Sequence, residues 1–131
     1  SLPIDQRAET VQTARNLVSV DCYNANPSSV ESTLRAFAAG QHEQPLAILG
    51  DMKELGEHAA AGHRLVRNVA RENGIECWAV GADFAAHAPA DRTFAQMDEL
   101  RDALESEPLK GRTVLLKGSR SMKMEDLVAV L

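Results

Sequence analysis

The side chains best suited to chemistry follow a short apolar run, Leu17–Val20. They are one carboxylate, one phenol and two amides: Asp21, Tyr23, Asn24 and Asn26. An aspartate can accept hydrogen bonds from ribose hydroxyls, a tyrosine ring can pack on a base, and an asparagine amide both donates and accepts. Ligands of open parallel sheets bind beyond the carboxyl ends of strands, so this cluster predicts a binding site. The alternative is a plain turn, because Asn and Pro favour turns.

A second polar segment, Lys117–Ser121, follows another apolar run and reads Lys-Gly-Ser-Arg-Ser. It combines a cation, a flexible glycine, two hydroxyls and a planar guanidinium at an expected strand-to-helix turn. Backbone N–H groups at a helix start attract anions, and an arginine can clamp a carboxylate with two hydrogen bonds. The segment therefore predicts an anion site, with a solvated basic loop as the alternative.

A third segment, Gly50–Gly56, places Asp51 and Glu54 between two glycines, close to an expected helix start. A carboxylate there gains about 0.3–1 kcal/mol from the helix dipole, so capping alone explains part of the pattern. The alternative is a pair of acids that receives a cationic group of a substrate.

One histidine lies near the apolar face of an expected helix. His63 stands three residues before Val66 and seven before Ala70, which puts it beside the buried stripe. The pattern favours a core histidine with satisfied ring nitrogens. The other histidines form no spacing that would bind a metal, so no metal site is predicted. These are His42, His58 and His87.

Short apolar runs alternate with helical segments, which predicts a mostly parallel sheet with helices on both faces, a Rossmann-like α/β domain over residues 17–131. Residues 1–16 are expected to form an incoming linker or an edge strand. The expected strands are Leu17–Val20, Pro45–Leu49, Ile75–Val80, Thr93–Phe94 and Arg112–Leu116. Three of them end at Asp21, Asp51 and Lys117, so three distant segments should converge on one cleft.

Capping signals place the helices. Ser28-x-x-Glu31 predicts a capping box at the start of the first helix, and Gly40 should end it. The second helix is expected over residues 57–73, and Asp98 should cap a later one. The residues of the second helix expected to face inward are Leu65, Val66, Val69 and Ala70. The chain is expected to end in a further helix.

The chain has 131 residues and a formal net charge of −5, a length that suits one domain. Lysine and arginine are scattered, so neither nucleic acid nor an anionic membrane is expected as a partner. Cys22 and Cys77 lie far apart, which favours reduced thiols in a cytoplasmic protein over a disulfide. No apolar run reaches the ~18 residues that span a bilayer, and no charged-then-apolar leader opens the chain, so no membrane insertion is expected.

The three motifs together resemble the third domain of the Mur ligases, most closely the type that joins D-alanyl-D-alanine to UDP-N-acetylmuramoyl-tripeptide. The matching patterns are Asp-x-Tyr-Asn-Ala-Asn-Pro at 21–27, Gly-Asp-Met-x-Glu-Leu-Gly at 50–56 and Lys-Gly-Ser-Arg-Ser-x-x-Met-Glu at 117–125. The resemblance covers about residues 18–131. It implies an ATP-dependent ligase in which the dipeptide amine attacks an acyl-phosphate.

The resemblance also implies roles for the site residues. The first motif would cover the nucleotide, through Asp21, Tyr23, Asn24 and Asn26. The last would hold the dipeptide or the transferring phosphoryl group, through Lys117, Ser119 and Arg120, with Lys117 catalytic. Asp51 and Glu54 would receive the dipeptide ammonium. His63 is a further candidate, because the family tends to carry a histidine in this helix.

The sequence contains neither Gly-x-x-x-x-Gly-Lys-[Ser/Thr] nor Gly-x-Gly-x-x-Gly, the usual phosphate-binding loops. In the Mur ligases the phosphate cradle and the magnesium ligands sit in the central domain, and the nucleotide-sugar site sits in the N-terminal one. The resemblance therefore implies a domain that is inactive alone and works with those two domains, in a monomeric enzyme.

Two other functions remain open from the residues. A signalling receiver domain also carries aspartates and a lysine at strand ends, and Asp21, Asp51 and Lys117 fit superficially. Such domains usually place a second acid after the first aspartate and a proline after the lysine, where this chain has Cys22 and Gly118. The other alternative is a nucleotide-binding module without catalysis.

Overall fold

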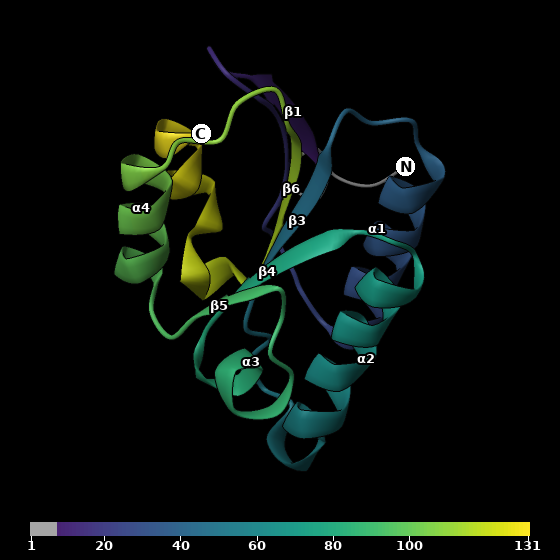
Figure 1. Cartoon of the computed structure of the whole chain (residues 1–131). Coiled ribbons are helices and arrows are strands. Elements are labelled where there is room, and N and C mark those ends of the chain that lie inside the picture. The colour runs from purple at the N-terminus through teal and green to yellow at the C-terminus, as the bar shows by residue number, and fades with distance from the viewer. Residues whose placement is uncertain (1–7) are drawn as a thin grey trace.

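A central sheet carries helices on both faces in the computed structural model, which describes residues 8–131 (Figure 1). The strand order is β1-β2-β6-β3-β4-β5. β1 is antiparallel to β2, and the other neighbouring pairs are parallel. The strands are β1 (Glu9–Gln12), β2 (Leu17–Asp21), β3 (Pro45–Gly50), β4 (Glu76–Val80), β5 (Arg92–Phe94) and β6 (Thr113–Lys117). The predicted Rossmann-like α/β fold is confirmed.

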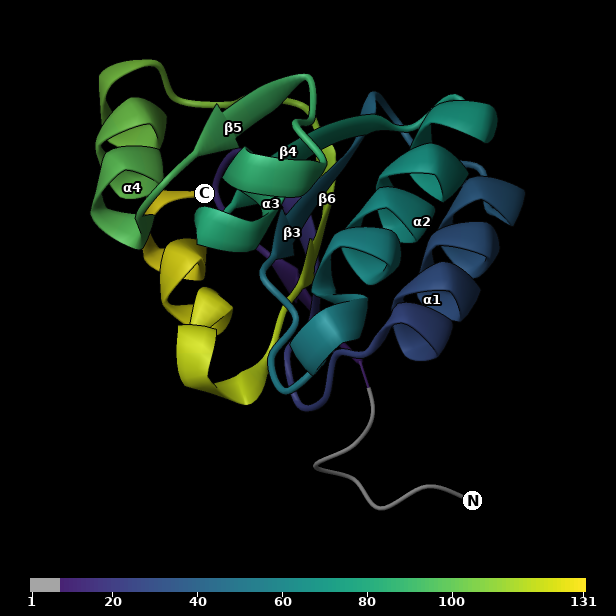
Figure 2. The same ribbon diagram turned by 90° about the horizontal axis from the view of Figure 1, so that it is seen from below.

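Figure 2 shows how the helices divide between the two faces of the sheet: α1 and α2 cover one, and α4 with the C-terminal turns covers the other. The α-helices are α1 (Pro27–Ala39), α2 (Ala59–Glu72), α3 (Ala82–His87) and α4 (Met97–Ser106). Three short 3₁₀ helices complete the described part, η2 (Gly56–His58), η3 (Arg120–Met122) and η4 (Met124–Val130). The chain therefore ends in a 3₁₀ helix where an ordinary helix was expected. Lys123, with φ of 52°, separates η3 from η4.

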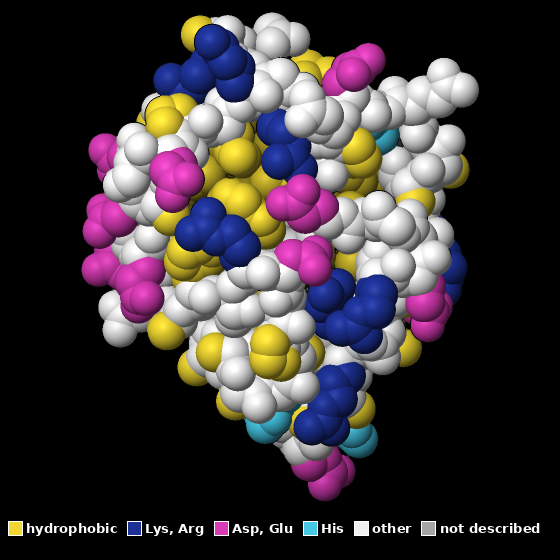
Figure 3. All heavy atoms as spheres, viewed as in Figure 1, with side chains coloured by type: hydrophobic (Ala, Val, Ile, Leu, Met, Phe, Trp, Pro, Cys, Tyr) yellow, Lys and Arg dark blue, Asp and Glu magenta, His cyan; other side chains and the backbone are white. Residues whose placement is uncertain are grey.

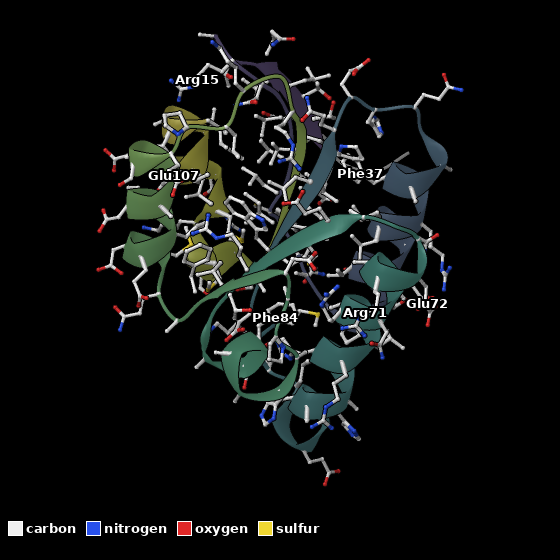
Figure 4. All side chains as sticks on the ribbon, in the orientation of Figure 1. Arg15, Phe37, Arg71, Glu72, Phe84 and Glu107 are labelled. Atoms are coloured by element: carbon white, nitrogen blue, oxygen red, sulfur yellow. The ribbon has the colours of Figure 1, made fainter. Side chains whose placement is uncertain are left out.

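Alternate residues of each strand feed two hydrophobic cores, because successive side chains point to opposite faces. On one face Leu49 and Leu115 pack with α1 and α2. On the other, Val18 and Leu116 pack with α4 and η4. In Figure 4 the aromatic rings of Phe37 on α1 and Phe84 on α3 point inward, and both belong to the first core. These cores hold the strand ends, and so the polar loops, in fixed relative positions.

The first helix begins earlier than its predicted capping box. Asn26 is the N-cap, and its side chain accepts from the backbone N–H of Ser29 while the Ser29 hydroxyl faces the Asn26 N–H. Pro27 occupies the first helical position, where it lacks only an N–H that would have had no partner. The predicted box at Ser28 and Glu31 is therefore wrong, and Glu31 pairs with an arginine one turn further on.

Two other details of the helices differ from expectation. Leu65 is 41% exposed, because the inner face of α2 runs through His63, Val66 and Ala70, and Leu65 lies to one side of that stripe. The N-cap of α4 is Gln96 rather than Asp98. Gly40 ends α1 as expected.

Surface charge is mixed on the face shown in Figure 3, with acidic side chains gathered over α4. The strand β1 lies within the segment for which a linker or an edge strand was expected, and residues 1–7 of that segment lie outside the described residues. Among the helices of residues 8–131, none has the length and apolarity that crossing a bilayer requires.

Candidate functional site

The ends of β2 and β6 bring together two side chains from distant parts of the sequence. Asp21 and Lys117 are paired in the parallel register of these strands. The Lys117 ammonium lies 3.1 Å from Asp21 Oδ1 and donates to the backbone oxygen of Asn24 at 3.0 Å. The Lys117 side chain is only 3% exposed and that of Asp21 is 18% exposed. A charged amine is thus held at the carboxyl ends of these strands, where it is buried and water screens it weakly.

A cavity of about 360 Å³ opens beside this ion pair. Each lining residue carries a polar group, and they come from β2, the following loop, α1 and β6. The lining residues are Asp21, Tyr23, Asn24, Ser29, Ser32, Thr33 and Lys117. Three of the four residues predicted to cover a nucleotide therefore meet here with the predicted catalytic lysine. The fourth, Asn26, lies at the start of α1 as its N-cap.

The loop after β6 reaches back to the loop after β2. The guanidinium of Arg120 lies 5.3 Å from the centre of the Tyr23 ring, a distance at which a cation and a ring face attract. Arg120 is exposed, whereas Ser119 is buried and its hydroxyl lies 3.2 Å from that of Ser121. Arg120 therefore offers its charge to solvent, close to the mouth of the cavity.

Asp51, the third predicted strand-end residue, points away from that cavity toward α3. Its buried carboxylate accepts from the backbone N–H groups of Asp83 at 2.9 Å and Phe84 at 3.0 Å. It thereby caps α3, which starts more than thirty residues further along the chain. Asp51 is only 2% exposed and both of its oxygens accept backbone hydrogen bonds, so its carboxylate is closed off from a substrate in this arrangement. Glu54 is exposed on the loop before η2, with φ of 61°.

His63 is fully buried beneath the same loop. Its Nε2 accepts from the backbone N–H of Met52 at 3.0 Å, and its Nδ1 lies 2.7 Å from the carbonyl oxygen of Ala59. Since Nε2 accepts, Nδ1 carries the proton and the ring is neutral. This is the satisfied core histidine that the pattern favours, and it ties the start of the Gly50–Gly56 loop to α2.

Asp51, His63 and Asp83 form the one group of potential metal ligands found in residues 8–131, with ligand atoms within 4.8 Å of one another. The chemistry of the group does not suit a metal. The His63 Nε2 lone pair faces the Met52 N–H, and the Asp51 oxygens hold the start of α3. A cation would have to break these bonds first.

Thr33 is absent from the predicted site residues, yet its hydroxyl donates to Asp21 Oδ2 at 3.2 Å. Thr33 lies on α1, three residues after Val30 and next to Leu34, both of which are buried. The sequence did contain a signal for Thr33. It is a polar residue beside the apolar stripe of the helix that follows Asp21, so its side chain could be expected near that carboxylate.

The cysteine nearest the site is inert as a nucleophile. Burial raises the pKa of the Cys22 thiol to about 12, and the negative charges of Glu125 and Asp21 add to the effect. Burial likewise raises the pKa of Cys77 to about 12. Because the thiolate is the reactive form, both side chains stay unreactive near neutral pH.

A mostly parallel sheet with a cavity and a buried lysine at its strand ends defines a Rossmann-like α/β domain with a candidate ligand site. The chain belongs to the family described as Mur ligase, glutamate ligase domain, whose profile matches residues 6–120. The resemblance read from the three motifs is confirmed.

Two relatives named UDP-N-acetylmuramoyl-tripeptide–D-alanyl-D-alanine ligase illustrate the similarity. The protein from Treponema pallidum is 32% identical over 122 residues, covering 86% of this chain and 27% of the relative. The one from Escherichia coli is 34% identical over 131 residues, covering 92% of this chain and 28% of the relative. The chain thus spans less than a third of the length of these relatives.

Two solved structures of MurF are also similar to this chain. MurF from Acinetobacter baumannii superimposes with a TM-score of 0.79 at 27% identity, over 98% of this chain and 30% of that one. MurF ligase from Thermotoga maritima in complex with ADP gives a TM-score of 0.75 at 21% identity, over 99% of this chain and 30% of that one. The latter match shows the fold.

Proposed function

We propose that this chain is the C-terminal domain of a cytoplasmic, ATP-dependent ligase that joins D-alanyl-D-alanine to UDP-N-acetylmuramoyl-tripeptide in peptidoglycan synthesis. The family membership and the names of the relatives support this assignment. The phosphate cradle, the magnesium ligands and the nucleotide-sugar site belong to the central and N-terminal domains. This domain alone is therefore inactive, and the complete enzyme works as a monomer.

Lys117 carries the proposed chemistry. An ammonium has three N–H donors. One donates to the Asn24 carbonyl, and Asp21 lies at ion-pair distance, which leaves donor capacity for a ligand in the cavity that Lys117 lines. A fixed cation in a site that excludes water stabilises negative charge as it develops, here on the phosphate that leaves when the dipeptide amine attacks the acyl-phosphate. The ion pair with Asp21 aims the lysine.

The nucleotide lies against the loop after β2. Tyr23 and Asn24 line the cavity and offer a ring face and an amide, while Asp21 has oxygen lone pairs left for a ribose hydroxyl. Asn26 contributes indirectly, because it fixes the start of α1. Closure of this domain over the central one covers the nucleotide and excludes water from the acyl-phosphate, which would otherwise hydrolyse.

The dipeptide meets the exposed groups of the other two loops. The Arg120 guanidinium binds the dipeptide carboxylate in a two-bonded geometry, and Ser119 lies beside it in the same loop. Glu54, exposed after β3, receives the dipeptide ammonium until that amine is deprotonated for attack. Asp51 and His63 act by positioning, because their hydrogen bonds hold the Glu54 loop and α3 in place.

The observation that carries the proposal is the buried Lys117–Asp21 pair beside the polar cavity. In the full-length ligase, Lys117→Ala should lower turnover by roughly 10²–10³-fold, the effect of removing one group that stabilises developing charge. Lys110→Ala, which removes an exposed lysine before β6, is the matched control and should leave turnover unchanged. Near-normal turnover of Lys117→Ala would remove Lys117 from the mechanism.

Two binding and labelling experiments test the rival functions, a signalling receiver domain and a non-catalytic nucleotide-binding module. A receiver domain would take a phosphoryl group on Asp51 from a small phosphodonor, but both oxygens of that buried carboxylate already bond to backbone N–H groups. We therefore expect no transfer of a phosphoryl group from the phosphodonor to Asp51. Tight binding of ATP by the isolated chain, without ligase activity of the full-length protein, would instead favour a non-catalytic nucleotide-binding module.

A further inference from the structure

Thr33 contacts the ion pair of the candidate site from the side of Asp21 that faces away from Lys117. Its hydroxyl donates to Asp21 Oδ2 at 3.2 Å, while Asp21 Oδ1 faces the Lys117 ammonium at 3.1 Å. The two oxygens of one carboxylate are thus held from opposite sides, one by α1 and one by β6. A hydrogen bond from the helix and an ion pair with the lysine therefore meet on one carboxylate.

The carboxylate needs such a second contact. The terminal torsion of an aspartate is broad, so one hydrogen bond does not fix the plane of the group. Asp21 is also the last residue of β2, and 18% of its side chain is exposed. Water could therefore compete for Oδ2 and turn the carboxylate away from Lys117.

Thr33 is suited to prevent that rotation. A threonine is stiff about its first side-chain torsion, and in a helix its hydroxyl often bonds back to the carbonyl one turn earlier. Here the hydroxyl reaches Asp21 instead. Its direction is thus fixed by the helix backbone, which Asn26 and Pro27 anchor at the start of α1.

Thr33 also lies where two cavities meet. Besides the cavity at Lys117, a second one of about 430 Å³ lies between α1 and the β1–β2 edge. The residues common to both linings are Asp21, Ser32 and Thr33. A carboxylate without the Thr33 hydroxyl would therefore have open space to turn into.

We infer that Thr33 is a positioning residue for the ligase reaction: its hydroxyl fixes the Asp21 carboxylate, which in turn aims the Lys117 ammonium into the cavity. The inference rests on the role proposed above for Lys117. It predicts that the effect of losing the Thr33 hydroxyl depends on the presence of the lysine, which a purely structural contribution to α1 would not require.

The test compares Thr33→Val, which keeps the shape and removes the hydroxyl, with Thr33→Ser, which keeps the hydroxyl. In the full-length ligase, Thr33→Val should lower kcat roughly tenfold or more, as expected for one hydrogen bond to a charged group, and leave KM for the dipeptide within about twofold. Thr33→Ser should restore most of the rate. Thr10→Val makes the same atomic change on the exposed strand β1 and should leave kcat unchanged.

The decisive measurement repeats Thr33→Val in the Lys117→Ala background. The inference expects no further loss of kcat there, because the positioned group is gone. An equal loss in both backgrounds, or a normal kcat for Thr33→Val beside a defective Lys117→Ala, would overturn the role of Thr33 alone. Normal turnover of Lys117→Ala would overturn the proposed function of the lysine and the inference with it.

Discussion

Asp21 and Lys117 are paired residues of neighbouring parallel strands, and their side chains meet across the sheet edge at 3.1 Å. The strands β2 and β6 are separated by most of the chain, with β3, β4, β5 and the four α-helices between them in the sequence. The ion pair therefore forms only when β2 and β6, which are distant in the sequence, become neighbours in the sheet.

The first prediction concerns the stability of this pair. Lys117→Met should lower the free energy of unfolding by about 2–4 kcal/mol, because it leaves the mostly buried Asp21 carboxylate without its cation. Adding Asp21→Asn should recover about 1–3 kcal/mol of that loss. Chemical denaturation of the four proteins in the cycle measures both values. As a control, Arg35→Met breaks the exposed helical pair with Glu31 and should cost about 0.5 kcal/mol or less.

A second prediction concerns Asp51 as the cap of α3. Asp51→Ala removes the acceptor of two backbone N–H groups, those of Asp83 and Phe84. The free energy of unfolding should fall by about 2–4 kcal/mol, since buried donors lose a charged partner. Asp98→Ala makes the same change in the exposed first turn of α4 and should cost less than about 1 kcal/mol. Equal losses for the two variants would contradict the capping role.

Much of this architecture can be predicted from residues alone. The apolar runs and their polar ends place the strands to within a residue or two, and the motif at Lys117 marks the loop that closes the site. The order of the strands cannot be obtained that way. Hydrophobic periodicity identifies β2 and β6 as strands, but it contains nothing that makes them neighbours.

The roles of Asp51 and His63 show a second limit. The sequence predicts that Asp51 caps the helix that follows it, whereas its partners lie on α3, beyond α2 and β4. Likewise, the backbone N–H that satisfies His63 Nε2 belongs to Met52, eleven residues earlier. Local capping rules consider only neighbours in the chain, so they miss caps that tertiary packing supplies.

The third prediction compares two glycines with positive φ. Gly81 has φ of 134°, and a side chain there would meet the Asp51 carboxylate, whereas Gly74 has φ of 67° and faces open space. Gly81→Ala should lower the free energy of unfolding by more than about 3 kcal/mol, through strain and displacement of the α3 cap. Gly74→Ala should cost only about 1–2 kcal/mol. Thermal unfolding of the two variants measures both losses. A loss for Gly81→Ala as small as that for Gly74→Ala would mean that the Asp51 carboxylate is not held in place.

The last prediction concerns the two buried thiols and alkaline pH. Burial raises the pKa of Cys22 and of Cys77 from 9.0 to about 12 in the folded chain. Above pH 9 the unfolded chain loses these protons while the folded chain keeps them, so stability is full below pH 9 and falls as pH rises toward 12. Between pH 9 and pH 10, each thiol should lower the free energy of unfolding by about 1 kcal/mol. Denaturation curves of the parent and of a Cys22→Ala, Cys77→Ala variant isolate the effect, because every other titrating group is shared. The variant should lose about 2 kcal/mol less than the parent over that interval, and parallel pH profiles would show that the thiols ionise equally well in the folded chain.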